Sequence, residues 1–82
     1  MVVKKLRGDL QKYLQKHNIT KQYLKQVKIF ENNPRHPSLN TEILEPKHLR
    51  IYSFRIDRKY RAIFILVASS EAEIVDVNLH YK

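Results

Sequence analysis

Apolar residues near the start of the chain recur at steps of three and four positions. The residues with this spacing are Val3, Leu6, Leu10, Tyr13 and Leu14. Such a period is typical of an amphipathic helix with one buried stripe. We therefore predict a first helix over about residues 2–17, ended by Asn18.

The same period continues beyond Asn18. Its apolar positions are Tyr23, Leu24, Val27 and Phe30. A second helix should follow to about residue 32, with Thr20 as its N-cap. Because the break between the helices is too short for a domain boundary, the pattern predicts a helical hairpin within a single domain of residues 1–82.

The second half of the chain has the period of strands. NNPRHPSL, residues 32–39, predicts a loop, since each proline disfavours helix in the residue before it. YSFRID, residues 52–57, alternates apolar and polar positions. The run YRAIFILV, residues 60–67, predicts a central strand covered on both faces, although such a run also fits a buried helix.

A last strand is predicted after a turn at ASSEA, residues 68–72. EIVDVNLHY, residues 73–81, should place Val75, Val77 and Leu79 on one face. The other face would carry Ile74, Asp76, Asn78 and His80. The whole pattern predicts an α+β domain, with the helical hairpin packed on an antiparallel sheet of three to four strands.

Charge narrows the function classes. Sixteen Lys and Arg against eight Asp and Glu give a net charge of +8, and residues 1–33 hold eight basic but only two acidic side chains. This excess favours a polyanionic partner, either nucleic acid or an acidic protein, although a charge run also fits a solvated helical face. The chain has no cysteine, and its four histidines lack zinc-site spacing, so we expect no metal or cofactor. Without an apolar run of about 20 residues or a signal sequence, we expect a cytoplasmic protein that does not bind membranes.

The candidate chemistry lies in the strands. His80 follows Asp76 and Asn78 on the polar face of the last strand, where a histidine can exchange protons near neutral pH. Its alternative is a solvated surface residue. Arg55 and Arg61 flank one predicted hairpin and either bind phosphate or form ion pairs with nearby acidic residues. The acidic candidates are Glu42, Asp57 and Asp76.

Five segments in order resemble the RelE/ParE superfamily of bacterial type II toxins. They are HPSL (36–39), TEIL (41–44), YSFRI (52–56), KYRAIF (59–64) and DVNLHYK (76–82). The resemblance covers about residues 4–82. It implies a helical hairpin on an antiparallel sheet and, for many members, cleavage of messenger RNA in the ribosomal A site.

The site pattern is similar to that of YoeB and its relatives. This resemblance implies Glu42 as general base, Arg61 as phosphate clamp and His80 as general acid. It also implies a role for Tyr81, which could stack on the nucleotide or hydrogen-bond to it; its alternative is a core position. Lys82, which follows the pair here, departs from the family pattern. Further RNA or phosphate contacts are expected from Arg55, Lys47, His48, Arg50, Arg58 and Lys59. His36 should be solvated, as His48 would be if it does not contact RNA, and His17 should have a structural role at the end of the first helix.

The family's usual first strand is expected to be missing, because only residues 1–3 precede the helical pattern. The exposed sheet edge would then need an antitoxin segment or a second copy of the chain. Expected partners are a cognate antitoxin, the ribosome and messenger RNA, with a homodimer as a further possibility. Two alternatives to the ribonuclease stay open: a ParE-like inhibitor of DNA gyrase, and an inactive remnant that binds RNA or antitoxin.

Overall fold

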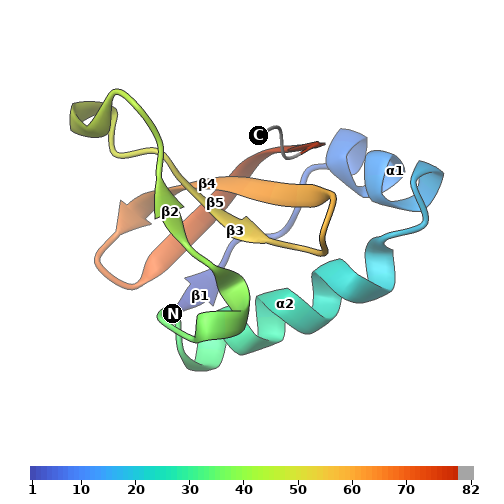
Figure 1. Cartoon of the computed structure of the whole chain (residues 1–82), viewed down its shortest axis with the longest axis horizontal. Helices are drawn as coiled ribbons and strands as arrows, with labels where there is room; N and C mark the ends of the chain where they lie inside the picture. Colours follow the sequence, from blue (N-terminus) through green and yellow to red (C-terminus); the bar gives the residue numbers. More distant parts are fainter. Residues whose placement is uncertain (80–82) are drawn as a thin grey trace.

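The computed structural model describes residues 1–79, in which five strands form one sheet beside two helices. The elements are β1 (Val2–Val3), α1 (Gly8–Lys16), α2 (Thr20–Asn32), β2 (Glu42–Ile43), β3 (Tyr52–Arg55), β4 (Tyr60–Ala68) and β5 (Glu71–Leu79). Short 3-10 turns, η1 (Pro37–Leu39) and η2 (Lys47–Leu49), flank β2. The strand order is β1-β5-β4-β3-β2, so β4 is central as predicted (Figure 1). Among residues 1–79, neither helix has the length and apolar content needed to cross a membrane.

The first strand is present, and the prediction that it is missing was wrong. β1 pairs in parallel with β5, so the sheet is mixed rather than purely antiparallel. The Val2 and Lys4 N–H groups donate to the Ser70 and Ala72 carbonyls at 2.8 and 2.9 Å. On its other side, β1 meets α2, where the Val3 N–H donates to Glu31 Oε2 at 3.3 Å. A side chain therefore satisfies a backbone donor at this sheet edge.

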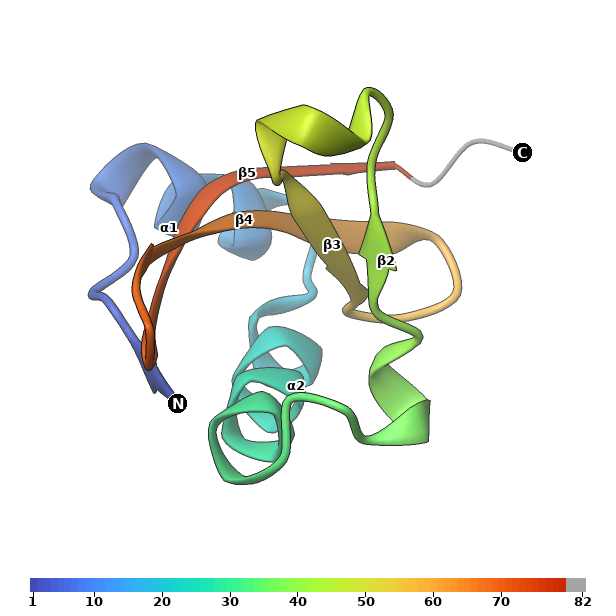
Figure 2. The same ribbon diagram turned by 90° about the vertical axis from the view of Figure 1, so that its left-hand side faces the viewer.

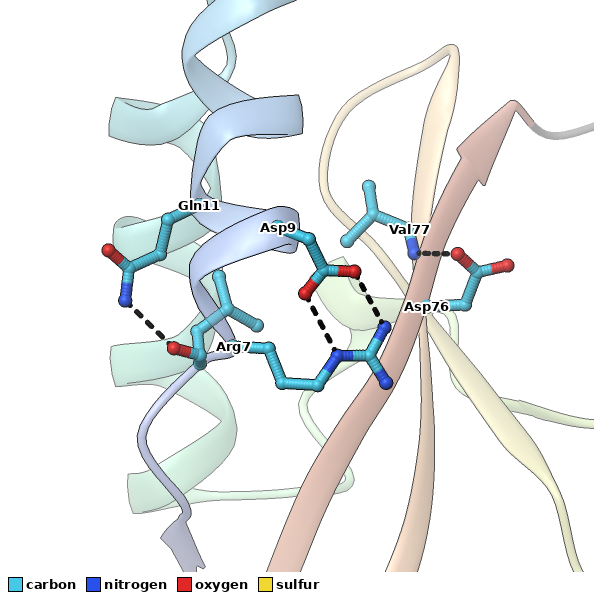
Figure 3. A network of polar contacts seen from close by, with 6 residues as sticks. Arg7, Asp9, Gln11, Asp76 and Val77 are labelled. Atoms are coloured by element: carbon cyan, nitrogen blue, oxygen red, sulfur yellow. Dashed lines mark hydrogen bonds and ion pairs between the residues drawn. The ribbon is translucent and has the colours of Figure 1, made fainter.

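The first helix begins at Gly8 rather than near residue 2. Val3 and Leu6 do pack against the core, but from β1 and from the connection that follows it. Arg7 forms a two-point contact with Asp9, with Nε and Nη2 lying 3.0 and 3.1 Å from the two carboxylate oxygens (Figure 3). This contact raises the pKa of Arg7 and lowers the pKa of Asp9. Both side chains are well exposed, so the pair adds little stability.

The second helix has the predicted extent but a different start and inner face. Its N-cap is Ile19, and the Oγ1 atom of Thr20 is buried with no hydrogen-bond partner among residues 1–79. Leu24, expected in the buried stripe, is 60% exposed. Gln26 is buried instead and donates from Nε2 to the Ser38 carbonyl at 3.2 Å and the Arg55 carbonyl at 2.8 Å. These bonds connect α2 to η1 and to β3.

An aromatic cluster joins α2 to the sheet. The Phe30 ring stacks on Phe54, with centroids 5.2 Å apart, and meets Phe64 edge-on at 5.0 Å. Tyr52 stacks on Phe64 from β3. Such pairs add about 0.5–1.5 kcal/mol each beyond the burial of their area. Leu10 and Leu14 of α1 belong to the same core, so both helices cover one face of the sheet.

The predicted faces of the last two strands need correction. The register between β4 and β5 shifts after the pair Ile63 and Asp76, which leaves Val75 as an extra residue, a β-bulge. The bulge reverses the alternation, so Ile74 and Val77 are both buried although an odd number of positions separates them. β4 is covered by helices on one face only: Ala62 and Phe64 are buried on the side of the helices, whereas Ile63 and Ile65 on the other face are only half-buried.

We expect Gln26→Ala to lower the free energy of unfolding by about 1–3 kcal/mol, because two backbone carbonyls lose their buried donor. Urea denaturation measures the change. Gln15→Ala, which removes an exposed amide from α1, is the matched control and should be nearly neutral. Equal effects of the two changes would contradict the structural role of Gln26.

A pH dependence should arise from Tyr23. Burial, and secondly the charge of Glu31, raises the pKa of Tyr23 to about 12, against about 10 in the unfolded chain. The neutral phenol is therefore favoured in the folded state. This stabilisation is complete below pH 10 and is lost as the pH rises towards 12, amounting to at most about 3 kcal/mol. Between these pH values, Tyr23→Phe should lose stability less steeply than the wild type; parallel curves would contradict this.

Candidate active site on the open face of the sheet

The polar residues of β2, β3, β4 and β5 form two rows on the face of the sheet that the helices leave open. In one row, Arg55 pairs with Arg61, and Arg61 pairs with Asn78. In the next row, Glu42 pairs with Ser53, Ser53 with Ile63 and Ile63 with Asp76. Residues directly opposite on neighbouring strands have side chains on the same face. The sheet therefore brings Glu42, Arg55 and Arg61 together from three strands.

Arg61 is the centre of this face. It is only 3% exposed, yet its guanidinium is hydrogen-bonded. Nε donates to Ser53 Oγ at 2.9 Å, and Nη2 donates to the Ser53 carbonyl at 3.3 Å. Nη2 also donates to the carbonyl of Asn40, a residue in the left-handed conformation two positions before Glu42. The buried cation therefore ties β4 to β3 and to the chain entering β2.

Glu42 supplies the opposite charge. Its Oε1 lies 4.0 Å from Arg61 Nη2, and its side chain is 47% exposed, compared with 4% for Arg61. Burial lowers the pKa of Arg61, an effect that the charge of Glu42 opposes and that of Arg55 reinforces. A guanidinium remains protonated in proteins even so. The site thus pairs a solvent-accessible carboxylate with a cation fixed beneath it.

The other two acidic candidates have different partners. Asp57 Oδ1 accepts the N–H groups of Lys59 and Tyr60, both at 2.8 Å. Asp76 Oδ1 accepts the N–H of Val77 at 2.9 Å, as Figure 3 shows, and its Oδ2 accepts from the Asn78 amide at 3.3 Å. Among residues 1–79, Glu42 is thus the acidic side chain in ion-pair range of Arg61.

The remaining predicted contact residues divide into two groups. Arg58 and Lys59 lie in the β3–β4 turn, next to the pair of Arg55 and Arg61. Lys47, His48 and Arg50 lie in the connection that enters β3 at its other end, where Arg50 lines a hollow with Leu66 to Ser69. The η2 turn in this connection lies on the far side of the sheet from α2 (Figure 2). The structure therefore does not gather all the basic residues at one point.

His80 and Tyr81, the predicted acid and its neighbour, lie outside the described residues. The described part of β5 ends at Leu79, which pairs with Tyr60, and the preceding pair is Asn78 with Arg61. Among residues 1–79, no three His, Asp or Glu side chains gather as metal ligands would.

Solved structures share this arrangement of helices and strands. A YoeB/ParE toxin from Agrobacterium tumefaciens superposes with a TM-score of 0.71 and 17% identity, over 98% of this chain and 96% of that one. A heterotetrameric YoeB–YefM toxin–antitoxin complex from Staphylococcus aureus gives 0.69 and 19%, over 98% and 94% of the chains. A further YoeB–YefM complex from the same organism gives 0.64 and 20%, over 99% and 98%. The chain has the fold of the YoeB/ParE toxins. No family model and no curated protein matches its sequence.

Within this YoeB/ParE fold, sequence reasoning missed three supporting residues. Ser53 and Asn40 hold Arg61, and Gln26 holds the carbonyl of Arg55. Ser53 alternates with the apolar residues Tyr52 and Phe54 of β3, and this position alone would give only weak evidence that it supports the site. His17 was expected to have a structural role; its Nδ1 lies 3.0 Å from the Tyr60 hydroxyl, and its ring packs on Tyr13.

We expect Ser53→Ala to lower the free energy of unfolding by about 1–3 kcal/mol, because Arg61 Nε loses its acceptor in a buried site. Ser69→Ala, in the exposed β4–β5 turn, is the control and should be neutral. Thermal or urea unfolding of both variants provides the comparison. A neutral Ser53→Ala would mean that this hydrogen bond does not support the site.

Proposed function

We propose that this protein is the toxin of a type II toxin–antitoxin system and cleaves messenger RNA on the ribosome. The observation that carries the proposal is the 4.0 Å approach of the exposed Glu42 carboxylate to the buried Arg61 guanidinium, with Arg55 in register beside it. A carboxylate next to two cations can accept a proton from an RNA ribose while the cations bind its phosphates, and the helices leave this face of the sheet open to such a substrate. The YoeB/ParE fold supports the same conclusion.

In the proposed reaction, Glu42 accepts the proton of a ribose 2′-OH, and the 2′ oxygen attacks the adjacent phosphorus. The bond between phosphorus and the 5′ oxygen breaks as a cyclic phosphate forms. His80 donates a proton to the departing 5′ oxygen. Each proton transfer contributes roughly 10² to 10⁴ in rate. Glu42 has the exposure that such a base needs, because the substrate must reach its oxygens.

The two arginines divide the binding of the phosphate. Arg55 is exposed, and its guanidinium has no hydrogen bond or ion pair within residues 1–79, so it can meet the phosphate directly. Arg61 contributes fixed positive charge from beneath. Its Nη1 makes no hydrogen bond within the described chain and is the nitrogen left for the phosphorane oxygens. Positive charge held where the negative charge develops lowers the barrier.

The C-terminal pair completes the proposed site. His80 follows Leu79 directly, and Leu79 pairs with the residue next to Arg61. We assign the general acid to His80, and to Tyr81 a stacking or hydrogen-bonding contact with the nucleotide. Lys47, His48, Arg50, Arg58 and Lys59 would bind RNA backbone through salt-sensitive contacts.

A cognate antitoxin is the proposed protein partner. The Staphylococcus aureus structures are complexes of YoeB with YefM. The net charge of +8 favours an acidic segment in an antitoxin of this chain.

The second candidate is a non-catalytic protein of the same fold, either a gyrase inhibitor or an RNA- or antitoxin-binding remnant. The burial of Arg61 and its bonds to Ser53 and Asn40 favour it, since a purely structural arginine would make the same contacts. A missing first strand would also have favoured a remnant, but this strand is present as β1.

Cleavage of a defined messenger in the A site of purified ribosomes tests the proposal. We expect Glu42→Gln to reduce the single-turnover rate about 100-fold or more, because the amide cannot accept the 2′-OH proton. His80→Ala should cause a loss of similar size. Glu45→Gln, which neutralises an exposed carboxylate three residues further on, should stay within about threefold of the wild type.

Equal rates for Glu42→Gln and wild type would exclude Glu42 as the base. A wild type that leaves the messenger whole, but inhibits DNA supercoiling by gyrase or only binds the ribosome, would establish the non-catalytic candidate.

A further inference from the structure

A shallow groove of about 390 Å³ lies between the α1–α2 connection and the β3–β4 turn. Glu42, Arg55 and Arg61 do not line it. Tyr60 does, and because it directly precedes Arg61 on β4, the two side chains point to opposite faces of the sheet. The groove therefore adjoins the candidate active site around the end of the β3–β4 hairpin. Its lining residues are His17, Asn18, Ile19, Gln22, Asp57, Arg58, Lys59 and Tyr60.

One side of the groove is aromatic and held in place. The Tyr60 hydroxyl contacts His17 Nδ1 at 3.0 Å, and the two rings lie 5.4 Å apart. The His17 ring also lies 4.2 Å from that of Tyr13, centroid to centroid. Ile19, which is buried beneath them, supports this side of the groove from the core. Rings fixed in this way form a wall against which a flat group can pack without a large loss of side-chain entropy.

The rim carries two amides that the fold does not use. Asn18 has φ of 56°, and its backbone makes the turn between the helices. Gln22 lies one helical turn further on, in α2. Both residues are exposed, and neither side chain makes a hydrogen bond within residues 1–79. Because an amide offers donors and an acceptor together, it matches the edges of nucleic acid bases.

The opposite side is cationic. Arg58 and Lys59 are exposed and have no ion-pair partner in the described chain. The one carboxylate of the groove, Asp57, is engaged in the turn, where its Oδ1 accepts the N–H groups of Lys59 and Tyr60. The groove thus combines a ring wall, free amides and a net positive charge.

We propose that this groove binds one nucleotide of single-stranded RNA outside the cleavage site. The base packs against the ring wall, its edge meets the amides of Asn18 and Gln22, and its phosphate lies on Arg58 and Lys59. The RNA strand then passes around the hairpin end from Arg55 to the groove. The identity of the ligand as RNA rests on the proposed function, whereas the chemistry of the groove does not.

Fluorescence anisotropy with labelled single-stranded RNA decamers tests this site, in the Glu42→Gln background so that the RNA stays intact. The variant Asn18→Gly/Gln22→Ala removes both amides, keeps every charge, and allows the positive φ at residue 18. We expect its Kd to rise about 5- to 100-fold, the range for losing good contacts to a base edge. The slope of log Kd against log salt should not change, because no phosphate contact is lost.

Two further variants complete the design. Arg58→Ala should weaken binding and reduce the salt slope by about one phosphate contact. Gln15→Ala removes an exposed amide that does not line the groove and should leave the Kd unchanged. An unchanged Kd for the double variant, an equal loss for Gln15→Ala, or no binding of RNA by the parent protein would overturn the proposal.

Ribosomal cleavage by the same groove variants, with Glu42 retained, separates this site from the proposed function. If Glu42→Gln stops cleavage while the groove variants bind and cleave as wild type, the groove proposal fails and the nuclease stands. If the groove variants lose RNA affinity while Glu42→Gln still cleaves, the groove stands and the assigned base is wrong.

Discussion

The buried guanidinium of Arg61 is the constraint on which the open face depends. A charge removed from water must have partners, and here they are the hydroxyl and carbonyl of Ser53 and the carbonyl of Asn40. β2 has only two residues, so few ladder hydrogen bonds hold it. The bond to Asn40 holds the backbone two positions before Glu42. One buried cation thereby connects β4, β3 and the chain that enters β2, and it lies 4.0 Å from the Glu42 carboxylate.

On the β1–β5 side of the sheet, local side chains bond to backbone donors that no further strand among residues 1–79 pairs. β1 covers only the start of β5, at Glu71 and Ala72. Beyond that point Asp76 accepts the N–H of its neighbour Val77, and at β1 the carboxylate of Glu31 accepts the N–H of Val3. A satisfied N–H is a poor template for an added strand. The carboxylates of Glu31 and Asp76 thus satisfy two of the backbone donors along the β1–β5 side of the sheet.

The basic residues proposed to contact RNA lie along the sheet face and the hairpin end instead of forming one compact patch. Arg58 and Lys59 follow the end of β3 at Arg55, which pairs with Arg61 of β4. Lys47 and Arg50 precede the other end of β3. Such a distribution suits a ligand with charges at regular intervals, as a nucleic acid backbone has. A compact anion would use only one of these groups.

The sequence alone determined the helical hairpin, the strands that follow it and the alternation in β3, because these follow from local periodicity; it did not reveal β1. It also singled out Glu42, Arg55 and Arg61, and the sheet register then placed them side by side. Tertiary structure alone decided where the first helix starts, since Val2 and Lys4 bond to residues about 70 positions away. It also decided the bulge at Val75, because only pairing with β4 determines which residue is left over. The burial of Gln26 and Ser53 has the same origin: their partners are distant in sequence, and no local pattern reports a hydrogen bond between distant segments.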